Sequence, residues 1–150
     1  MVLKGRLLQR SFLSVNQTGL DLSAYDWDET LPNQYKKSWD DWLNSLVSTK
    51  EVRIPRSFYP YGFSPNSQEL HIFCDASDDA IGYVAYIKSI GHSCMHVAFV
   101  VASSKVAPKS ATSIPRLELC AAVEASRAAT NIKLDLSRPI DGLFMYTDSQ

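Results

Sequence analysis

The chain has 150 residues, of which 45% are hydrophobic and 21% are charged, and its 15 basic side chains nearly balance its 16 acidic ones. This composition is typical of a folded globular protein and excludes disordered, collagen-like and low-complexity chains. A net charge of −1 gives no bulk attraction for nucleic acid. Nucleic-acid binding would therefore depend on local groups of residues.

The sequence gives no signal for a membrane or for secretion. Its longest uncharged stretches, such as residues 80–87 and 97–104, are far shorter than the roughly 18 apolar residues that span a bilayer. The basic N-terminal residues are not followed by an apolar run with a cleavage site. Cys74, Cys94 and Cys120 form no C-x-x-C spacing, which favours reduced thiols in a cytoplasmic or nuclear protein over a metal or disulfide role.

The first predicted element is an amphipathic helix over residues 32–47. Aromatic and leucine side chains recur there at steps of three and four, and Pro32 suits a first helical turn. Trp39 and Trp42 lie on this apolar stripe, which predicts packing against protein. Stacking of nucleic-acid bases on exposed indoles is the alternative.

Residues 55–67 contain three prolines, a glycine and an asparagine, which predicts an irregular linker and a domain boundary. We therefore expect a mainly helical segment over residues 1–65 and a second domain over residues 66–150. In the second domain, runs of β-branched and aromatic residues predict three strands, with Gly91 in the turn between the last two. These strands are expected at residues 70–75, 81–88 and 96–103.

A helix is predicted over residues 114–134, with Ser113 or Ile114 as its cap and Pro115 in its first turn. A further strand is predicted over residues 142–147. If the helix is a crossover, this last strand runs parallel to a strand of the first group. The predicted fold is therefore α/β, a mixed α+β sheet in the order β-β-β-α-β, preceded by a small helical segment.

Three carboxylates stand out in this arrangement. Asp75 and Asp148 each end an apolar strand, and both would emerge at the carboxyl edge of the sheet, where open α/β sheets place their sites. Glu118 lies in the first turns of the helix, at the start of a stripe of small side chains that lets a helix lie close to a sheet. This stripe consists of Ala121, Ala122, Ala125 and Ala129.

Converging carboxylates repel one another unless positive charge neutralises them. Mg²⁺ bound by a few carboxylates does so, and a pair of such ions can activate a water molecule and stabilise the leaving oxygen of a phosphodiester. Each residue also has a simpler interpretation. An Asp after a strand is often a turn former, and a Glu in a first helical turn often only complements the helix dipole.

The motifs around these carboxylates resemble the Asp, Glu, Asp motifs of a ribonuclease H domain. They are Phe-Cys-Asp-Ala-Ser at residues 73–77, Pro-Arg-Leu-Glu-Leu at 115–119 and Tyr-Thr-Asp-Ser at 146–149. More narrowly, residues 26–29, 54–56 and 104–108 resemble the Pol polyprotein of BEL/Pao long-terminal-repeat retrotransposons. The resemblance covers roughly residues 20–150 and keeps the order of the family's motifs.

The resemblance implies that Asp75, Glu118 and Asp148 are catalytic metal ligands for two Mg²⁺ ions. The reaction would be hydrolysis of the RNA strand of an RNA/DNA hybrid, which is distinguished from a DNA duplex by its minor groove and 2′-hydroxyls. The implied partners are this hybrid and the rest of Pol, and the implied location is a cytoplasmic virus-like particle or the nucleus. Residues 1–65 resemble the segment that follows reverse transcriptase, a region that carries the label Pao retrotransposon peptidase.

Weaker candidates for nucleic-acid contacts surround these ligands. Ser77 and Ser149 could contact the backbone of the hybrid, but a serine beside a strand end is more often a local turn donor. Lys105, Lys109 and Arg116 could contact phosphates, and a merely solvated basic surface is the alternative.

The sequence also departs from the family's pattern. It has no Asp-Thr/Ser-Gly motif of an aspartic peptidase and no Tyr-x-Asp-Asp of a polymerase. The fifth strand, the later helices, and the His and fourth acidic ligand of a complete ribonuclease H are not found. His71 precedes the second Asp motif and is expected to serve packing or hydrogen bonding. We therefore expect an inactive or unstable fragment of Pol with exposed apolar faces.

Other functions are compatible with the same fold. A non-catalytic relic or scaffold within a polyprotein or a domesticated gene is the main alternative. An integrase-type site would have the order Asp, Asp, Glu. A sugar-kinase-type ATPase would need Gly-rich phosphate loops, which the sequence does not show.

Overall fold

The computed structural model describes residues 33–47, 52–107 and 113–148. The chain forms two compact units, residues 1–53 and 54–150, and each is described by itself. Among the described residues, no helix is both long enough and apolar enough to cross a membrane.

The described part of the first unit contains helix α2 (Asn33–Val47), which lies where the apolar periodicity predicts a helix. Trp39 and Trp42 are partly buried, and their ring centroids are 4.7 Å apart. The Ser45 hydroxyl donates a hydrogen bond of 2.6 Å to the Trp42 carbonyl oxygen. The predicted Pro32 start lies outside the described residues.

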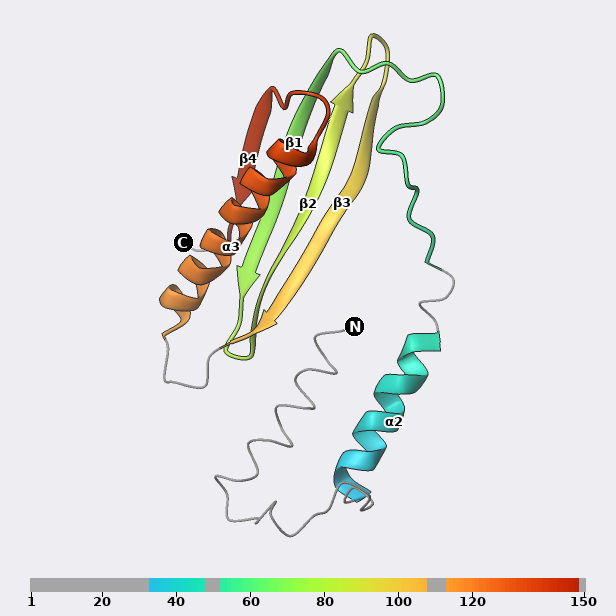
Figure 1. The fold of residues 1–150 in the computed structure, drawn as a ribbon. Coiled ribbons are helices and arrows are strands. Elements are labelled where there is room, and N and C mark those ends of the chain that lie inside the picture. Colours follow the sequence, from blue (N-terminus) through green and yellow to red (C-terminus); the bar gives the residue numbers. More distant parts are fainter. Residues whose placement is uncertain (1–32, 48–51, 108–112, 149–150) are drawn as a thin grey trace. The chain divides into compact units, whose positions relative to one another are not determined.

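The second unit is built on one four-stranded sheet in the order β3-β2-β1-β4 (Figure 1). The first three strands form an antiparallel meander, in which the Gly91 N–H donates to the Cys94 carbonyl oxygen in the β2–β3 turn. The last strand runs parallel to β1, which confirms the predicted crossover and the mixed sheet. The strands are β1 (Ser67–Ala76), β2 (Ala80–Ile90), β3 (Met95–Val106) and β4 (Gly142–Tyr146).

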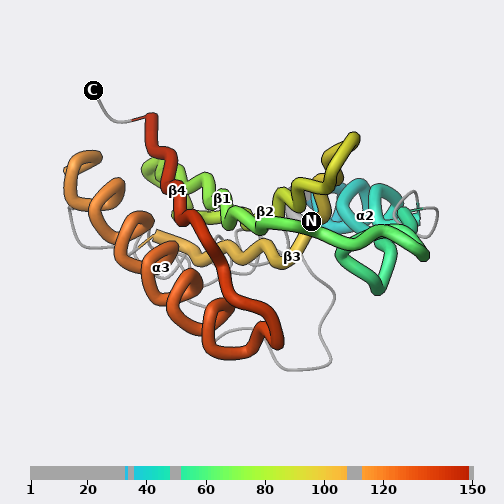
Figure 2. Tube along the Cα trace, turned by 90° about the horizontal axis from the view of Figure 1, so that it is seen from above, coloured from blue at the N-terminus to red at the C-terminus, as the bar shows by residue number. Residues whose placement is uncertain are grey.

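Helix α3 (Ile114–Asp135) connects β3 to β4 and lies along one face of the sheet (Figures 1 and 2). Ser113 takes the N-cap position, but its side chain makes no capping hydrogen bond, so only the backbone part of the predicted cap is present. The buried alanines on α3 are Ala121, Ala125, Ala128 and Ala129. The predicted small-residue stripe is therefore the packing face, with Ala128 added and Ala122 at its margin.

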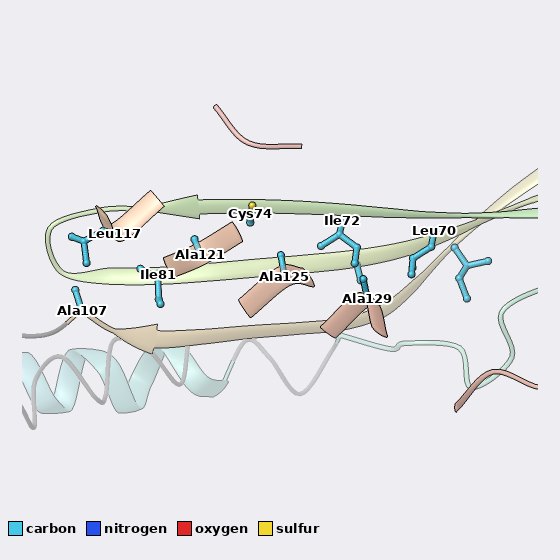
Figure 3. Close-up of a cluster of buried hydrophobic side chains, with 11 residues drawn as sticks. Leu70, Ile72, Cys74, Ile81, Ala107, Leu117, Ala121, Ala125 and Ala129 are labelled. Carbon is cyan, nitrogen blue, oxygen red and sulfur yellow. The ribbon is translucent and has the colours of Figure 1, made fainter. Parts of the chain in front are cut away.

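The hydrophobic core lies between α3 and the first two strands (Figure 3). Alternation along β1 buries Leu70, Ile72 and Cys74 against the helix. A small stripe suits this contact, because alanines let the helix axis approach the sheet closely. The intervening positions of β1, among them His71 and Phe73, face away from α3.

The short strand β4 lies at one edge of the sheet and has both faces partly open. Leu143 and Met145 pair with core positions of β1, yet they are 43% and 39% exposed. Phe144 and Tyr146 point to the opposite face, where they are 43% and 41% exposed. The apolar exposure expected from the sequence is therefore present around this strand.

Candidate active site

The parallel pairing of β1 with β4 brings the chain to Asp75 and to Asp148 at the same end of the sheet. Phe73 pairs with Tyr146, and their rings stack with centroids 4.5 Å apart. Asp75 lies two residues after Phe73, within the last two residues of β1, and Asp148 lies two residues after Tyr146, just beyond the end of β4. Because side chains alternate between faces along β1, the Asp75 carboxylate belongs to the same face as the stacked rings.

The pKa of the Cys74 thiol depends on the charges of both carboxylates. Its Sγ donates to the Tyr146 carbonyl oxygen at 3.5 Å, so it lies at the seam between β1 and β4. Burial raises the pKa of the Cys74 thiol, and the negative charges of Asp75 and Asp148 raise it further. Both aspartates therefore lie close enough to this sulfur to act on it electrostatically.

The two aspartates are open to solvent, as a site for a large substrate requires. The Ala76 N–H donates to Asp75 Oδ1 at 2.6 Å, which orients this carboxylate at the end of β1. A carboxylate has further lone pairs beyond the one used here, so Asp75 can also accept from water or bind a cation.

Glu118 comes to the same end of the sheet from α3. Its neighbour Leu117 is 2% exposed and belongs to the core, and Figure 3 shows Leu117 beyond Cys74, at the end to which β1 points. Glu118 itself is partly buried. The helix lies on the face of Cys74, whereas alternation puts Asp75 on the other face.

This difference in faces bears on metal binding. The described residues contain no group of three or more His, Cys, Asp or Glu side chains placed to hold a metal ion. The predicted three-carboxylate cluster is thus not assembled, although its members approach the same end of the sheet. Carboxylate oxygens suit Mg²⁺ in their chemistry.

The weaker nucleic-acid candidates take different places. The Ser77 hydroxyl donates to the Ala80 carbonyl oxygen at 3.2 Å and accepts from the Ala80 N–H at 3.2 Å, so it closes the β1–β2 turn. Lys105 Nζ lies 2.6 Å from Glu124 Oε2 and forms an ion pair. Arg116 is exposed in the first turn of α3. Lys109 and Ser149 lie outside the described residues.

Hydrogen bonds around His71 were not predicted in detail from the sequence. Its Nδ1 and Tyr146 Oη are 2.9 Å apart, and its Nε2 lies 3.2 Å from Glu69 Oε2. Lys88 Nζ also donates to Glu69 Oε2 at 2.8 Å. The alternation of Glu69, His71 and Phe73 along one face was the available signal, but Tyr146 and Lys88 come from other strands.

Cys74, Cys94 and Cys120 are all free thiols. No match was found among the curated proteins. Residues 5–149, nearly the whole chain, match the family described as Pao retrotransposon-like RNaseH-like domain. Together with the β-β-β-α-β order and the aspartates at the ends of parallel strands, this match shows that the chain belongs to the Pao retrotransposon-like RNaseH-like domain family.

Proposed function

We propose that this ribonuclease H-like region carries out Mg²⁺-dependent hydrolysis of the RNA strand of RNA/DNA hybrids within a Pol polyprotein. The observation that supports the proposal most strongly is the parallel pairing of Phe73 with Tyr146, which come two residues before Asp75 and Asp148. The Cys74 pKa, raised in part by both charges, supports their proximity.

Each carboxylate has a separate role in this proposal. Asp75 and Asp148 would hold the divalent ions, with Asp75 oriented by the Ala76 N–H. Glu118, in the first turns of α3, would be the third ligand, and it would have to reach the aspartates from the helix-covered face of the sheet. Mg²⁺, when bound, supplies charge neutralisation and activation of water for attack on the phosphodiester. The hybrid would be read through the shape of its minor groove and its 2′-hydroxyls.

The partner most consistent with β4 is the remainder of Pol. Apolar side chains on both faces of this strand are about two-fifths exposed, whereas large apolar patches on globular proteins usually contact other protein. We propose that further Pol polypeptide covers these faces and that residues 1–150 alone do not cleave. Residues 1–65 would belong to the reverse transcriptase side and residues 66–150 to ribonuclease H, acting in a virus-like particle or the nucleus.

The test is cleavage of a labelled RNA/DNA hybrid by the chain extended along the downstream Pol reading frame. We expect Mg²⁺-dependent cleavage that falls by roughly 100-fold or more in Asp75→Asn and Asp148→Asn, because an ion that loses a ligand loses several kcal/mol of transition-state stabilisation. Glu118→Gln should also reduce cleavage. Asp135→Asn, at the other end of α3, is the matched control and should cleave normally.

A non-catalytic scaffold is the second candidate, and one observation favours it: the described residues contain no assembled group of three metal-binding side chains. A scaffold would bind the hybrid without cleaving it, and its binding would not change with Mg²⁺. Cleavage that is indifferent to Asp75→Asn would reject the proposed site.

A further inference from the structure

The open face of the sheet carries a stack of aromatic rings across the β1–β4 seam. The His71 ring stacks on Phe144 at a centroid distance of 4.9 Å and an interplanar angle of 12°. It also lies parallel to Tyr146, with centroids 5.9 Å apart and planes within 9°. Tyr146 in turn stacks on Phe73. His71 and Phe73 on β1 thus contact both open-face side chains of β4.

The chemistry of the partners fixes the direction of the His71 hydrogen bonds. The Lys88 and His71 hydrogen bonds lower the pKa of the Glu69 carboxyl, so Glu69 is ionised at neutral pH and can only accept. The Nε2 of His71 must therefore carry the proton that Glu69 accepts. In the neutral ring this leaves the Nδ1 lone pair to accept from the Tyr146 hydroxyl.

The other contacts that hold β4 along its own axis include the backbone pairing with β1, the stack of Phe73 on Tyr146 and a 3.7 Å contact from the Ser126 hydroxyl to the Met145 sulfur. The strand has only five residues and pairs with a single neighbour. At its start, the Gln68 N–H donates to Asp141 Oδ2, and the Asp141 N–H donates to the Gln68 carbonyl oxygen, both at 2.8 Å. Near its end, the bond between Cys74 and the Tyr146 carbonyl is long. The side chain that contacts the middle of the strand on the open face is His71.

His71 can distinguish the observed register of β4 on β1 from a register that is shifted by two residues. Such a slip keeps every side chain on its own face, so apolar burial alone does not oppose it. It would move Asp148 about 6.6 Å along the strand relative to Asp75, too far for both to share an ion that holds its ligands at about 2.1 Å. Of the open-face residues Phe144 and Tyr146, only Tyr146 has a hydroxyl. The His71 hydrogen bond is therefore lost if a shift puts Phe144 in the place of Tyr146.

We propose that His71 is a positioning residue. Its hydrogen bond to Tyr146, oriented by Glu69, holds β4 at the register that places Asp148 beside Asp75. The functional meaning of this register rests on the proposed function, but the positioning itself does not require metal or hybrid.

Amide hydrogen exchange measured by NMR on the whole chain tests this inference. In Tyr146→Phe, which keeps the stacked ring, we expect β4 amides to exchange roughly three- to tenfold faster, the factor that corresponds to one net hydrogen bond. The amides of β2 serve as the internal reference and should change much less. His71→Ala should have a larger effect, and His71→Asn, whose side-chain oxygen can accept the same hydroxyl, should restore part of the protection.

Tyr86→Phe is the matched control, because it removes a hydroxyl from the same face on β2, a strand that does not pair with β4. The positioning role is overturned if Tyr146→Phe affects β4 no more than Tyr86→Phe does, or if β2 and β4 lose protection equally. Since this measurement uses neither Mg²⁺ nor hybrid, its failure leaves the cleavage experiment to judge the proposed function separately.

Discussion

The Cys74 thiol offers a direct probe of the two aspartates. Its pKa is raised by burial and then by the charges of Asp75 and Asp148. We expect Asp75→Asn and Asp148→Asn each to lower this pKa, because removing a negative charge makes the thiolate less costly. The pH dependence of the alkylation rate measures it, in a background where Cys94 and Cys120 are replaced by serine.

Asp135→Asn, at the far end of α3, is the control for this probe and should leave the alkylation profile unchanged. Burial is the largest cause of the raised pKa, so the thiol should stay less acidic than an exposed one even in the double Asp variant. An Asp148→Asn variant with the parent profile would show that Asp148 does not lie beside β1.

At the residue scale, the position of Asp75 and Asp148 after strands could be predicted from the sequence, because each follows a recognisable apolar run. The partner of His71 could not be predicted in the same way. Tyr146 lies 75 residues away in the chain, and the contact depends on the register between two strands. Likewise, an apolar pattern does not say that Asp75 and Glu118 approach the sheet end from opposite faces.

Among the elements, α3 depends on small side chains at its contact with the sheet. Ala125 is fully buried, so Ala125→Leu would force added volume into the α3–sheet interface. We expect a loss of about 1–3 kcal/mol in the free energy of unfolding, measured by urea denaturation. Thr130→Leu, on the exposed side of the same helix, should cost much less. Equal losses would contradict close packing at Ala125.

Most element boundaries could be predicted from periodicity and breakers. The hairpin strands extend beyond their predicted ends, to Ala80–Ile90 and Met95–Val106, because backbone pairing continues past the last strongly apolar residue. The register of the β2–β3 pairing shifts between Ala85 and Tyr86, and no glycine or proline at these positions predicts this shift. The parallel pairing of β4 with a strand of the first group was predicted from the crossover rule and not from any residue in β4.

At the scale of the whole molecule, the exposed faces of β4 predict self-association. Leu143 and Phe144 together present apolar surface on both sides of an edge strand. We expect the double variant Leu143→Thr/Phe144→Thr to weaken association by roughly tenfold or more, since burying one such side chain contributes about 1.5–3 kcal/mol. Sedimentation velocity over a concentration series measures this.

Val97→Thr is the control for this association, because Val97 is also exposed but lies on β3, at the opposite edge of the sheet. It should leave the sedimentation profile nearly unchanged. If it weakens association as strongly as the β4 variant does, the contact does not centre on β4. The overall β-β-β-α-β order was predictable from sequence, whereas the extent of this exposed surface required the strand order.

The matched spacing from Phe73 to Asp75 and from Tyr146 to Asp148 has an evolutionary consequence. The loop between Leu136 and Asp141 can gain or lose residues without moving either carboxylate. The position of β4 is set by its pairing with β1, which starts at Gly142, and not by the length of this loop. A single-codon deletion between Gly142 and Asp148 would instead turn the second carboxylate to the opposite side of the sheet. In copies of the retrotransposon whose site is kept by selection, insertions and deletions should therefore be found before β4 and not within it.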